Sequence, residues 1–345
     1  MARGSGDRGT GAVYVQSNER GNNKLLAFDR DDVGGLKSPV AMQTGGSGDG
    51  VAHLTSQGSV MLTGDGGSVL VANAGSGDMS IFALDTDGPH MMQTVPTGGA
   101  PKSVTEHDGL VYVLNTDPPS LTGFRLSDRA IEPIDDSTRM LAADADPAQV
   151  GLSPDGTSLV VTERGSNDIA SYAVNADGTL AERHVQRSSG PTPYGFAFAR
   201  GEALIVTEAF GAQKGKAAAS SYLMRDENIE PASRSVGNGR SEVCWAAVSN
   251  DGRYAFATNF ADSAVSRYAI GADGRLTLED PAAGTAVDGQ PGLRDENLSD
   301  DGRFLYAIDA DTQRIFGWTV GSGGSLSPIG SWGGLPNTVA GLAAS

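Results

Sequence analysis

Residues 146–182 read DPAQVGLSPDGTSLVVTERGSNDIASYAVNADGTLAE, a succession of short apolar runs separated by turn residues. This pattern predicts four strands, over residues 147–153, 158–162, 169–174 and 179–180. The turns between them, at 154–156, 165–168 and 175–178, are rich in Gly, Asn, Asp and Pro, which suit tight backbone geometry. One small meander cannot bury both of its faces, so it needs similar units beside it.

Such units recur along the chain. The first-strand pattern returns at residues 57, 101, 147, 193, 243, 293 and 337, with spacings of 44, 46, 46, 50, 50 and 44 residues. An apolar second strand follows at residues 13–15, 69–71, 111–113, 159–161, 204–206, 254–256 and 304–306. A period of this length is typical of a four-stranded propeller blade. The sequence therefore predicts an all-β, seven-bladed β-propeller.

The order of the units also predicts how the ring closes. The chain begins with a second strand (Val13–Val15) and ends with an unpaired first strand at residues 337–343. We expect the C-terminal strand to complete the N-terminal blade, because this leaves no sheet edge open. Residues 1–11 are expected to be a flexible leader, and residues 12–345 a single propeller domain.

Composition limits the possible partners. The net charge of −17, from 25 basic and 42 acidic residues, argues against nucleic acid because no basic stripe could neutralise phosphates. No apolar run approaches the ~20 residues of a membrane span. The N-terminus has no apolar signal-peptide core, so a cytoplasmic location is expected unless an export signal has been removed. A small-molecule substrate is the expected partner, and no oligomeric state is favoured.

The sequence predicts neither a metal nor a cofactor. The four histidines and the single Cys244 form no cluster with metal-ligand spacing. The Gly-rich stretches lead into strands instead of helices, so no phosphate-binding loop is expected.

Candidate site residues follow from propeller geometry, because the first strand of each blade lines the axis. Blade seven carries Arg294, Asp295 and Glu296 there, where the other copies have small or apolar residues. Buried polar residues are costly unless they are solvated or paired. This run predicts either a functional channel or an internal ion pair of Arg294 that plugs the axis. Four further residues at strand entrances are expected to bind substrate: Lys102, Gln149, Tyr194 and Trp245.

A second group lies at the ends of the second strands. A polar residue stands there in every copy, and the asparagines are explained by hydrogen bonds to local backbone. Glu208 and Glu163 are longer and fit a turn role less well. A carboxylate pair near the axis could act as general acid or base, so both are candidate catalytic residues. His53 precedes the first strand of blade two and is a further catalytic candidate.

The blade pattern resembles a known family. Residues 147–163 read as Pro-x-x-Val-x-Leu-Ser-Pro-Asp-Gly-x-x-Leu-Val-Val-Thr-Glu, and Asp-Gly-Arg-Leu-Thr follows at 273–277. This pattern is similar to that of the seven-bladed lactonase family, which includes propeller 6-phosphogluconolactonases and carboxymuconate lactonizing enzymes. The similarity covers nearly the whole chain and says more about fold than about activity.

The resemblance also implies site residues. Its better understood members carry a histidine, two arginines and a glutamate in an axial pocket without metal. The glutamate corresponds to Glu208, and one arginine to Arg294, although Leu293 replaces the proline before it. The histidine would fall near Ala148 and Gln149, and the other arginine near Tyr194, so both are absent. This half-retained pocket argues against an ordinary phosphogluconolactonase.

The sequence thus leads to one main functional hypothesis. It is a cofactor-independent lactonase- or cycloisomerase-like enzyme for a small polyoxygenated or acidic substrate. Arg294 would hold an anionic group or oxyanion, Glu208 would act as base or acid with help from Glu163 or His53, and Tyr194 and Trp245 would form an apolar wall. A biosynthetic cyclase or lyase for a larger substrate, and a propeller scaffold that binds without catalysis, remain open as alternatives.

Overall fold

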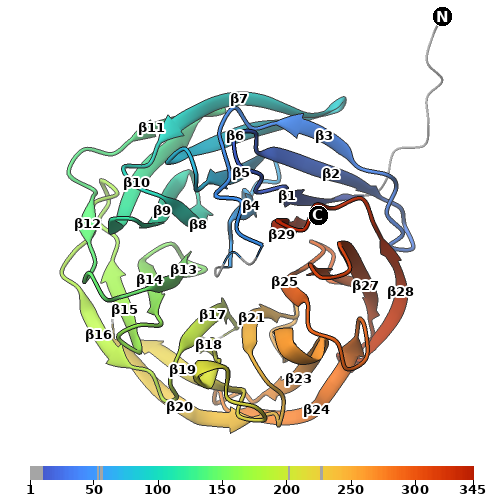
Figure 1. The fold of residues 1–345 in the computed structure, drawn as a ribbon. Coiled ribbons are helices and arrows are strands. Elements are labelled where there is room, and N and C mark those ends of the chain that lie inside the picture. Colours follow the sequence, from blue (N-terminus) through green and yellow to red (C-terminus); the bar gives the residue numbers. More distant parts are fainter. Residues whose placement is uncertain (1–10, 53, 55–56, 201–202, 226–227) are drawn as a thin grey trace, which may run out of the picture.

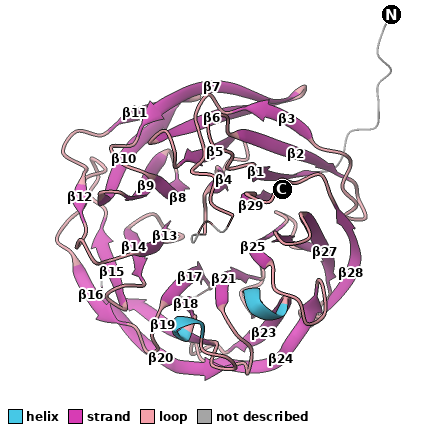
Figure 2. Cartoon of the chain, in the orientation of Figure 1, coloured by secondary structure: helices cyan, strands magenta, loops and turns pink. Residues whose placement is uncertain are grey.

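The computed structural model describes residues 11–52, 54, 57–200, 203–225 and 228–345. These residues form a ring of seven blades around a central axis, and each blade is an antiparallel sheet whose strands lie side by side in order from the axis to the rim (Figure 1). Apart from two short 3₁₀ helices, η1 (Phe210–Ala212) and η2 (Phe260–Asp262), the described chain is strand and loop (Figure 2). The predicted all-β, seven-bladed propeller is confirmed.

The strands occupy four positions in each blade. The innermost strands are β4 (Val60–Leu62), β8 (Pro101–His107), β13 (Pro147–Leu152), β17 (Pro193–Phe198), β21 (Val243–Val248), β25 (Leu293–Leu298) and β29 (Ala340–Ala344). The second strands are β1 (Gly11–Gln16), β5 (Ser68–Asn73), β9 (Leu110–Thr116), β14 (Ser158–Glu163), β18 (Ala203–Glu208), β22 (Tyr254–Asn259) and β26 (Phe304–Asp309).

The outer half of each blade is more exposed. The third strands are β2 (Lys24–Arg30), β6 (Asp78–Asp85), β10 (Pro119–Ser127), β15 (Asp168–Ala173), β19 (Ala218–Arg225), β23 (Ala264–Ile270) and β27 (Arg314–Val320). The rim strands are β3 (Val40–Gln43), β7 (Gly88–Pro96), β11 (Ala130–Pro133), β12 (Arg139–Met140), β16 (His184–Arg187), β20 (Asn228–Gly237), β24 (Leu276–Thr285) and β28 (Leu326–Trp332).

Burial explains the strand sequences. Every residue of β5, β14, β18 and β26 is buried, because both faces of a second strand pack against neighbouring blades. Such strands read as continuous apolar runs without polar alternation. The core is therefore divided into clusters between successive blades, each drawn from adjacent sheets.

The turn between the first and second strands is built by its sequence. In blade four the Ser153 hydroxyl donates to Asp155, 2.6 Å away, and Asp155 accepts from the backbone N–H of Thr157. Gly156 takes a φ of +70°, which favours glycine. The same hydroxyl–aspartate pairing recurs in three other blades, at Thr63–Asp65, Ser249–Asp251 and Ser299–Asp301. This repeat is what makes the blade boundaries readable in the sequence.

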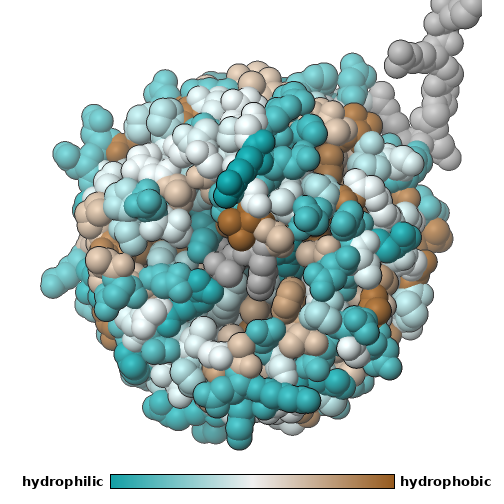
Figure 3. All heavy atoms as spheres, in the orientation of Figure 1, coloured by the Kyte–Doolittle hydropathy of each residue, from teal (hydrophilic) through white to brown (hydrophobic). Residues whose placement is uncertain are grey.

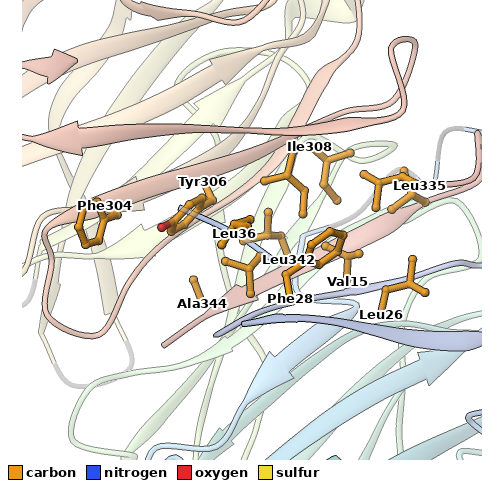
Figure 4. Packing of buried hydrophobic residues seen from close by; sticks show 13 residues of the cluster. Val15, Leu26, Phe28, Leu36, Phe304, Tyr306, Ile308, Leu335, Leu342 and Ala344 are labelled. Carbon is orange, nitrogen blue, oxygen red and sulfur yellow. The ribbon is translucent and has the colours of Figure 1, made fainter. Parts of the chain in front are cut away.

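The ring closes as predicted. β29 pairs with β1 in the sheet β29–β1–β2–β3, with Val13 opposite Ala344 and Val15 opposite Leu342. Leu342 and Ala344 then pack with Phe304, Tyr306 and Ile308 of blade seven (Figure 4). The C-terminal strand therefore contributes both ladder hydrogen bonds and apolar contacts to the seam between the first and last blades.

Three details differ from the sequence-based expectations. The fourth strand of blade four is β16, whereas the predicted strand at 179–180 forms only a bridge between Val174 and Leu180 within a turn. The rim of blade three is split into β11 and β12, which both pair with β10. β1 begins at Gly11, and the remainder of the expected leader, residues 1–10, lies outside the described residues.

The surface agrees with the composition. The face of the ring seen in Figure 3 carries mainly hydrophilic and intermediate side chains, with apolar ones scattered among them. None of the helices in the described ranges has the length and apolar character needed to cross a membrane.

Candidate active site

The innermost strands share an irregularity that shapes the axis. Their pairing with the second strands shifts register near the strand entrance, at Lys102, Ala148, Tyr194–Gly195, Cys244 and Asp295. An extra residue of this kind is a β-bulge, which bends the strand and changes the direction of a side chain. The repeated bulges therefore decide which residues face the axis.

An axial cavity of about 390 Å³ lies inside the ring. Its apolar walls include Val60, Val104, Val150 and Phe196 from the innermost strands of blades two to five. Gly64 and Asp300, from turns between first and second strands, also border it, so the cavity extends to the turn end of the ring. The polar side chains that border it include Gln149, Asp295 and Glu296.

Asp295 is the most unusual of these groups. It lies at the bulge of β25 with a φ of +37° and is 2 % exposed. Its carboxyl group accepts hydrogen bonds from the backbone N–H of Gly341 and from the side chain of Trp245. Its Oδ2 atom has no hydrogen-bond partner among the described residues. Burial raises the pKa of Asp295 to about 7, against the opposing effect of Arg294.

Glu296 follows directly in β25 and is equally buried. Adjacent residues of a regular strand point to opposite faces, but with the bulge between Arg294 and Glu296 both Asp295 and Glu296 border one cavity. The Glu296 carboxyl group faces the backbone N–H of Thr258, yet neither oxygen has a partner of normal hydrogen-bond geometry within the described chain. Burial raises its pKa well above the ordinary value, which favours the protonated form.

Arg294 lies behind this pair and is fully buried. Its Nη2 donates to the carbonyl of Val339, while Nε and Nη1 have no partner in the part of the chain that the structure describes. Burial lowers the pKa of Arg294, and the charge of Asp295 opposes this shift. Arg294 is not among the described residues that border the axial cavity. It therefore stabilises the ionised form of Asp295 without contacting the cavity.

The predicted apolar wall is assembled at the strand entrances. The rings of Tyr194 and Trp245 lie 5.5 Å apart at 58°, and they pack with Ala148 and Cys244. The guanidinium of Arg164 lies over the Tyr194 ring, 5.1 Å from its centre. These residues pack together at the strand entrances, where Trp245 contacts Asp295. The described lining of the axial cavity does not include Tyr194, Trp245, Ala148 or Cys244.

Lys102 is also buried at the strand entrances, with 8 % of its surface exposed. Burial, together with the nearby charge of Arg164, lowers its pKa to about 8. The described lining of the axial cavity does not include it. Among the residues predicted from blade entrances, the structure thus places Gln149, Asp295 and Glu296 at the cavity.

Two glutamine side chains near the axis each form two hydrogen bonds to the backbone of one residue in another blade. Gln149 donates to the Phe196 carbonyl (3.0 Å) and accepts from the Phe196 N–H (2.6 Å). Gln57 makes the same pair of bonds to the N–H and carbonyl of Ala246, in a blade that is not its neighbour. Gly195 leaves room for it, because a Cβ there would lie 2.3 Å from the Gln57 Oε1 atom. The sequence analysis missed Gln57, although its amide at a position held by Pro, Val or Leu in five of the six other copies was a usable signal.

Glu208 and Glu163 lie in a different environment from the one expected. Glu208 accepts hydrogen bonds from Ser220, Ser235 and the N–H of Gly190, on the outer side of its strand. Burial raises the pKa of Glu208, and these donors oppose the shift. The described cavity lining includes neither glutamate, so Glu208 is not brought together there with the blade-seven carboxyl groups.

Glu163 is likewise engaged within its own blade. Its two oxygens accept hydrogen bonds from Arg183 at 2.8 and 2.9 Å, and Ser166 donates a third. Both glutamates therefore bind their own blades together, as Asn73 and Asn259 do at the equivalent positions. The sequence indicates where a second strand ends, but it does not indicate in which direction the side chain of the last residue points. His53, the remaining catalytic candidate, lies outside the described residues.

The described residues offer no group of three or more His, Cys, Asp or Glu side chains suited to a metal ion. The chemistry that their arrangement can support is proton transfer at a cavity whose lining is about equally polar and apolar. One carboxyl group there has a pKa near neutrality and a second favours its protonated form.

Comparison with known proteins identifies the family of this chain. The family model described as lactonase, 7-bladed beta-propeller, matches residues 103–209 and 205–333. No curated protein sequence matches the chain significantly.

Several solved structures share the fold. A candidate 6-phosphogluconolactonase of Bacteroides fragilis is 19 % identical, with a TM-score of 0.72 and 100 % of both chains covered. The periplasmic gluconolactonase of Pseudomonas aeruginosa is 17 % identical, with a TM-score of 0.74 over 97 % of this chain and 98 % of that one. A Desulfotomaculum acetoxidans protein of unknown function is also 17 % identical, with a TM-score of 0.75 over 97 % and 98 % of the chains. Because the family model spans most of the sequence, the chain belongs to the seven-bladed β-propeller lactonase family.

Proposed function

We propose that the protein is a lactonase-like hydrolase that opens a small, neutral cyclic ester in the axial cavity. The observation that carries this proposal is the pair Asp295 and Glu296, two buried acidic residues that border one cavity and have different surroundings. Two carboxyl groups whose pKa values are separated by their environments are a common arrangement for an acid and a base.

Asp295 is the general base in this scheme. A water molecule near its Oδ2 atom loses a proton to Asp295 while its oxygen adds to the lactone carbonyl carbon. Hydrogen bonds from Gly341 and Trp245 hold the carboxyl group in place, and Arg294 favours its ionised form. A base with a pKa of about 7 is well matched to this role near neutral pH.

Glu296 is the hydrogen-bond donor. In its protonated form it donates to the carbonyl oxygen of the lactone as negative charge develops there. When the tetrahedral intermediate collapses, the ring C–O bond breaks and the departing oxygen takes the proton held by Asp295. The product is the open hydroxy acid, and both carboxyl groups return to their starting states.

The cavity favours a neutral substrate. The lining residues that the structure describes include no Lys or Arg, and Asp300 lies near the turn end. A phosphorylated or carboxylated substrate would meet three acidic side chains without a cation in contact, so we do not extend the phosphogluconolactone reaction to this chain. The apolar walls instead suit the carbon atoms of a neutral ring.

A panel of neutral lactones tests the proposal, with hydroxy-acid release followed by titration. We expect measurable hydrolysis by the native protein and a loss of about 10²–10⁴-fold in kcat/KM for Asp295→Asn, the range typical of a removed general base. Glu208→Gln, a matched carboxyl-to-amide change away from the cavity, is expected to retain activity. Native activity in Asp295→Asn, or the larger loss in Glu208→Gln, would overturn this assignment.

A further inference from the structure

A second hollow lies on the turn end of the ring, over blades four to six. It has a volume of about 520 Å³ and is bordered by Phe198, Ala199, Met224 and Val248. The turns at 153–158 and 249–252 form its two sides. We refer to this hollow as the turn groove.

The turn groove adjoins the axial cavity. Phe198 borders both, and its ring packs edge-on against Phe196 of the cavity wall, with centroids 5.8 Å apart. The strand β13 connects them in the same way, because Leu152 borders the cavity and Ser153 borders the groove. The two hollows are therefore adjacent, with Phe198 as their common wall residue.

Several polar groups of the groove already have hydrogen-bond partners. The hydroxyl groups of Ser153 and Thr157 donate to Asp155, and the Ser249 hydroxyl donates to Asp251. Arg200 donates to the Asn250 carbonyl across the rim. The groove thus combines an apolar surface, formed by Phe198, Ala199, Met224 and Val248, with a polar rim in which Arg200 joins two turns. An apolar chain would bury carbon surface against these four side chains, whereas a hydroxyl group placed against them would lose hydrogen bonds to water.

We infer that the turn groove is a subsite for an apolar tail, so that the preferred substrate is a lactone ring carrying an alkyl or acyl chain. The ring lies at Asp295 and Glu296, and the chain passes Phe198 to reach Met224 and Val248. This inference rests on the proposed function and narrows its substrate class.

A ring-matched series tests it: γ-butyrolactone, γ-octalactone and γ-dodecalactone share one ring and differ only in tail length. For the native protein we expect KM to fall by about three- to fourfold for each CH₂ that becomes buried. The decisive quantity is the ratio of kcat/KM for the longest lactone to that for γ-butyrolactone. Met224→Ala and Phe198→Ala are each expected to lower this ratio by about tenfold, the effect of losing one large apolar contact.

Phe316→Ala is the matched control, because Phe316 is also partly buried but packs in blade seven. It is expected to preserve the ratio even if it lowers stability. An equal KM across the series, or an equal drop in the ratio for Phe316→Ala, would overturn the subsite.

A binding measurement separates this inference from the proposed function. Calorimetry with tetrahydrofuran and 2-octyl-tetrahydrofuran needs no turnover, and the alkylated ether is expected to bind more tightly to the native protein than to Met224→Ala. If no lactone is hydrolysed but this difference in binding is found, the apolar subsite is supported and the hydrolase proposal is wrong. If lactones are hydrolysed and the two ethers bind alike, the groove fails alone.

Discussion

The side chain of Gln57 in blade two is joined to the backbone of Ala246 in blade six by two hydrogen bonds of 2.7 and 3.0 Å. Because these blades are not neighbours in the ring, the two bonds tie the hub together across the axis. Gln57 also borders the axial cavity, so the same residue supports the fold and shapes the candidate site.

Gln57→Ala is expected to lower the free energy of unfolding by about 1–3 kcal/mol, because it leaves the buried N–H and carbonyl of Ala246 without partners. Chemical denaturation measures this loss. Gln93→Ala is the matched control: Gln93 makes the same two bonds to Ile131, but nearer the rim. Both variants should lose stability, whereas only Gln57→Ala should alter lactone hydrolysis. Equal activity in the two variants would contradict a hub role for Gln57 at the site.

The pH profile of hydrolysis should follow Asp295. A base must be ionised to act, and burial raises the pKa of Asp295 to about 7. We therefore expect kcat/KM to rise with pH through an inflection near pH 7. Measurements with γ-butyrolactone from pH 5 to 9 provide the test. A flat profile, or a decline across the same range, would show that Asp295 is not the base.

Stability should depend on pH in the opposite direction. The folded pKa of Asp295 lies above its ordinary value of 3.8, so the folded state binds a proton that the unfolded state releases. This contribution is complete below about pH 4 and is lost as the pH rises to about 7, at a cost of up to about 4 kcal/mol. Asp295→Asn cannot ionise, so its melting temperature should fall less between pH 4.5 and 7.5. A parallel fall in both proteins would refute the buried, titrating carboxyl group.

Removal of residues 336–345 should prevent stable folding. The deletion removes β29, exposes the edge of β1 and uncovers the cluster that includes Phe304 and Ile308. We expect aggregation or a large drop in melting temperature, and partial recovery when a peptide of residues 336–345 is added. A truncated chain that melts cooperatively at the native temperature would contradict closure by the C-terminal strand.

The sequence predicts the fold well because the same local chemistry is repeated in each blade. The Ser153–Asp155–Gly156 turn and the apolar run of β14 can be read directly, since hydroxyl–aspartate pairing and continuous burial leave clear residue patterns. The rim strands are predicted less reliably. In blade four the exposed β16 lacks an apolar pattern, whereas the turn at 175–180 contains one.

The site is only partly predictable. The polar run at 294–296 indicates the axis, and the structure places Asp295 and Glu296 at a cavity there. The bulge that lets both residues border that cavity depends on strand pairing and leaves no mark in the residue types. Glu208 was a catalytic candidate because it is a long acidic side chain at a strand end. Its hydrogen-bond partners, Ser220 and Ser235, come from strands whose register the sequence does not reveal.

The most direct test of the axial site is a crystal structure of Asp295→Asn soaked with γ-octalactone. The variant should bind the lactone without opening it, because the base is missing and the cavity is intact. We predict density for the ring next to Asn at position 295 and Glu296, with the carbonyl oxygen within hydrogen-bond distance of the Glu296 carboxyl group. Density found only elsewhere, for example beside Lys102 or Glu208, with none next to Glu296, would contradict the account.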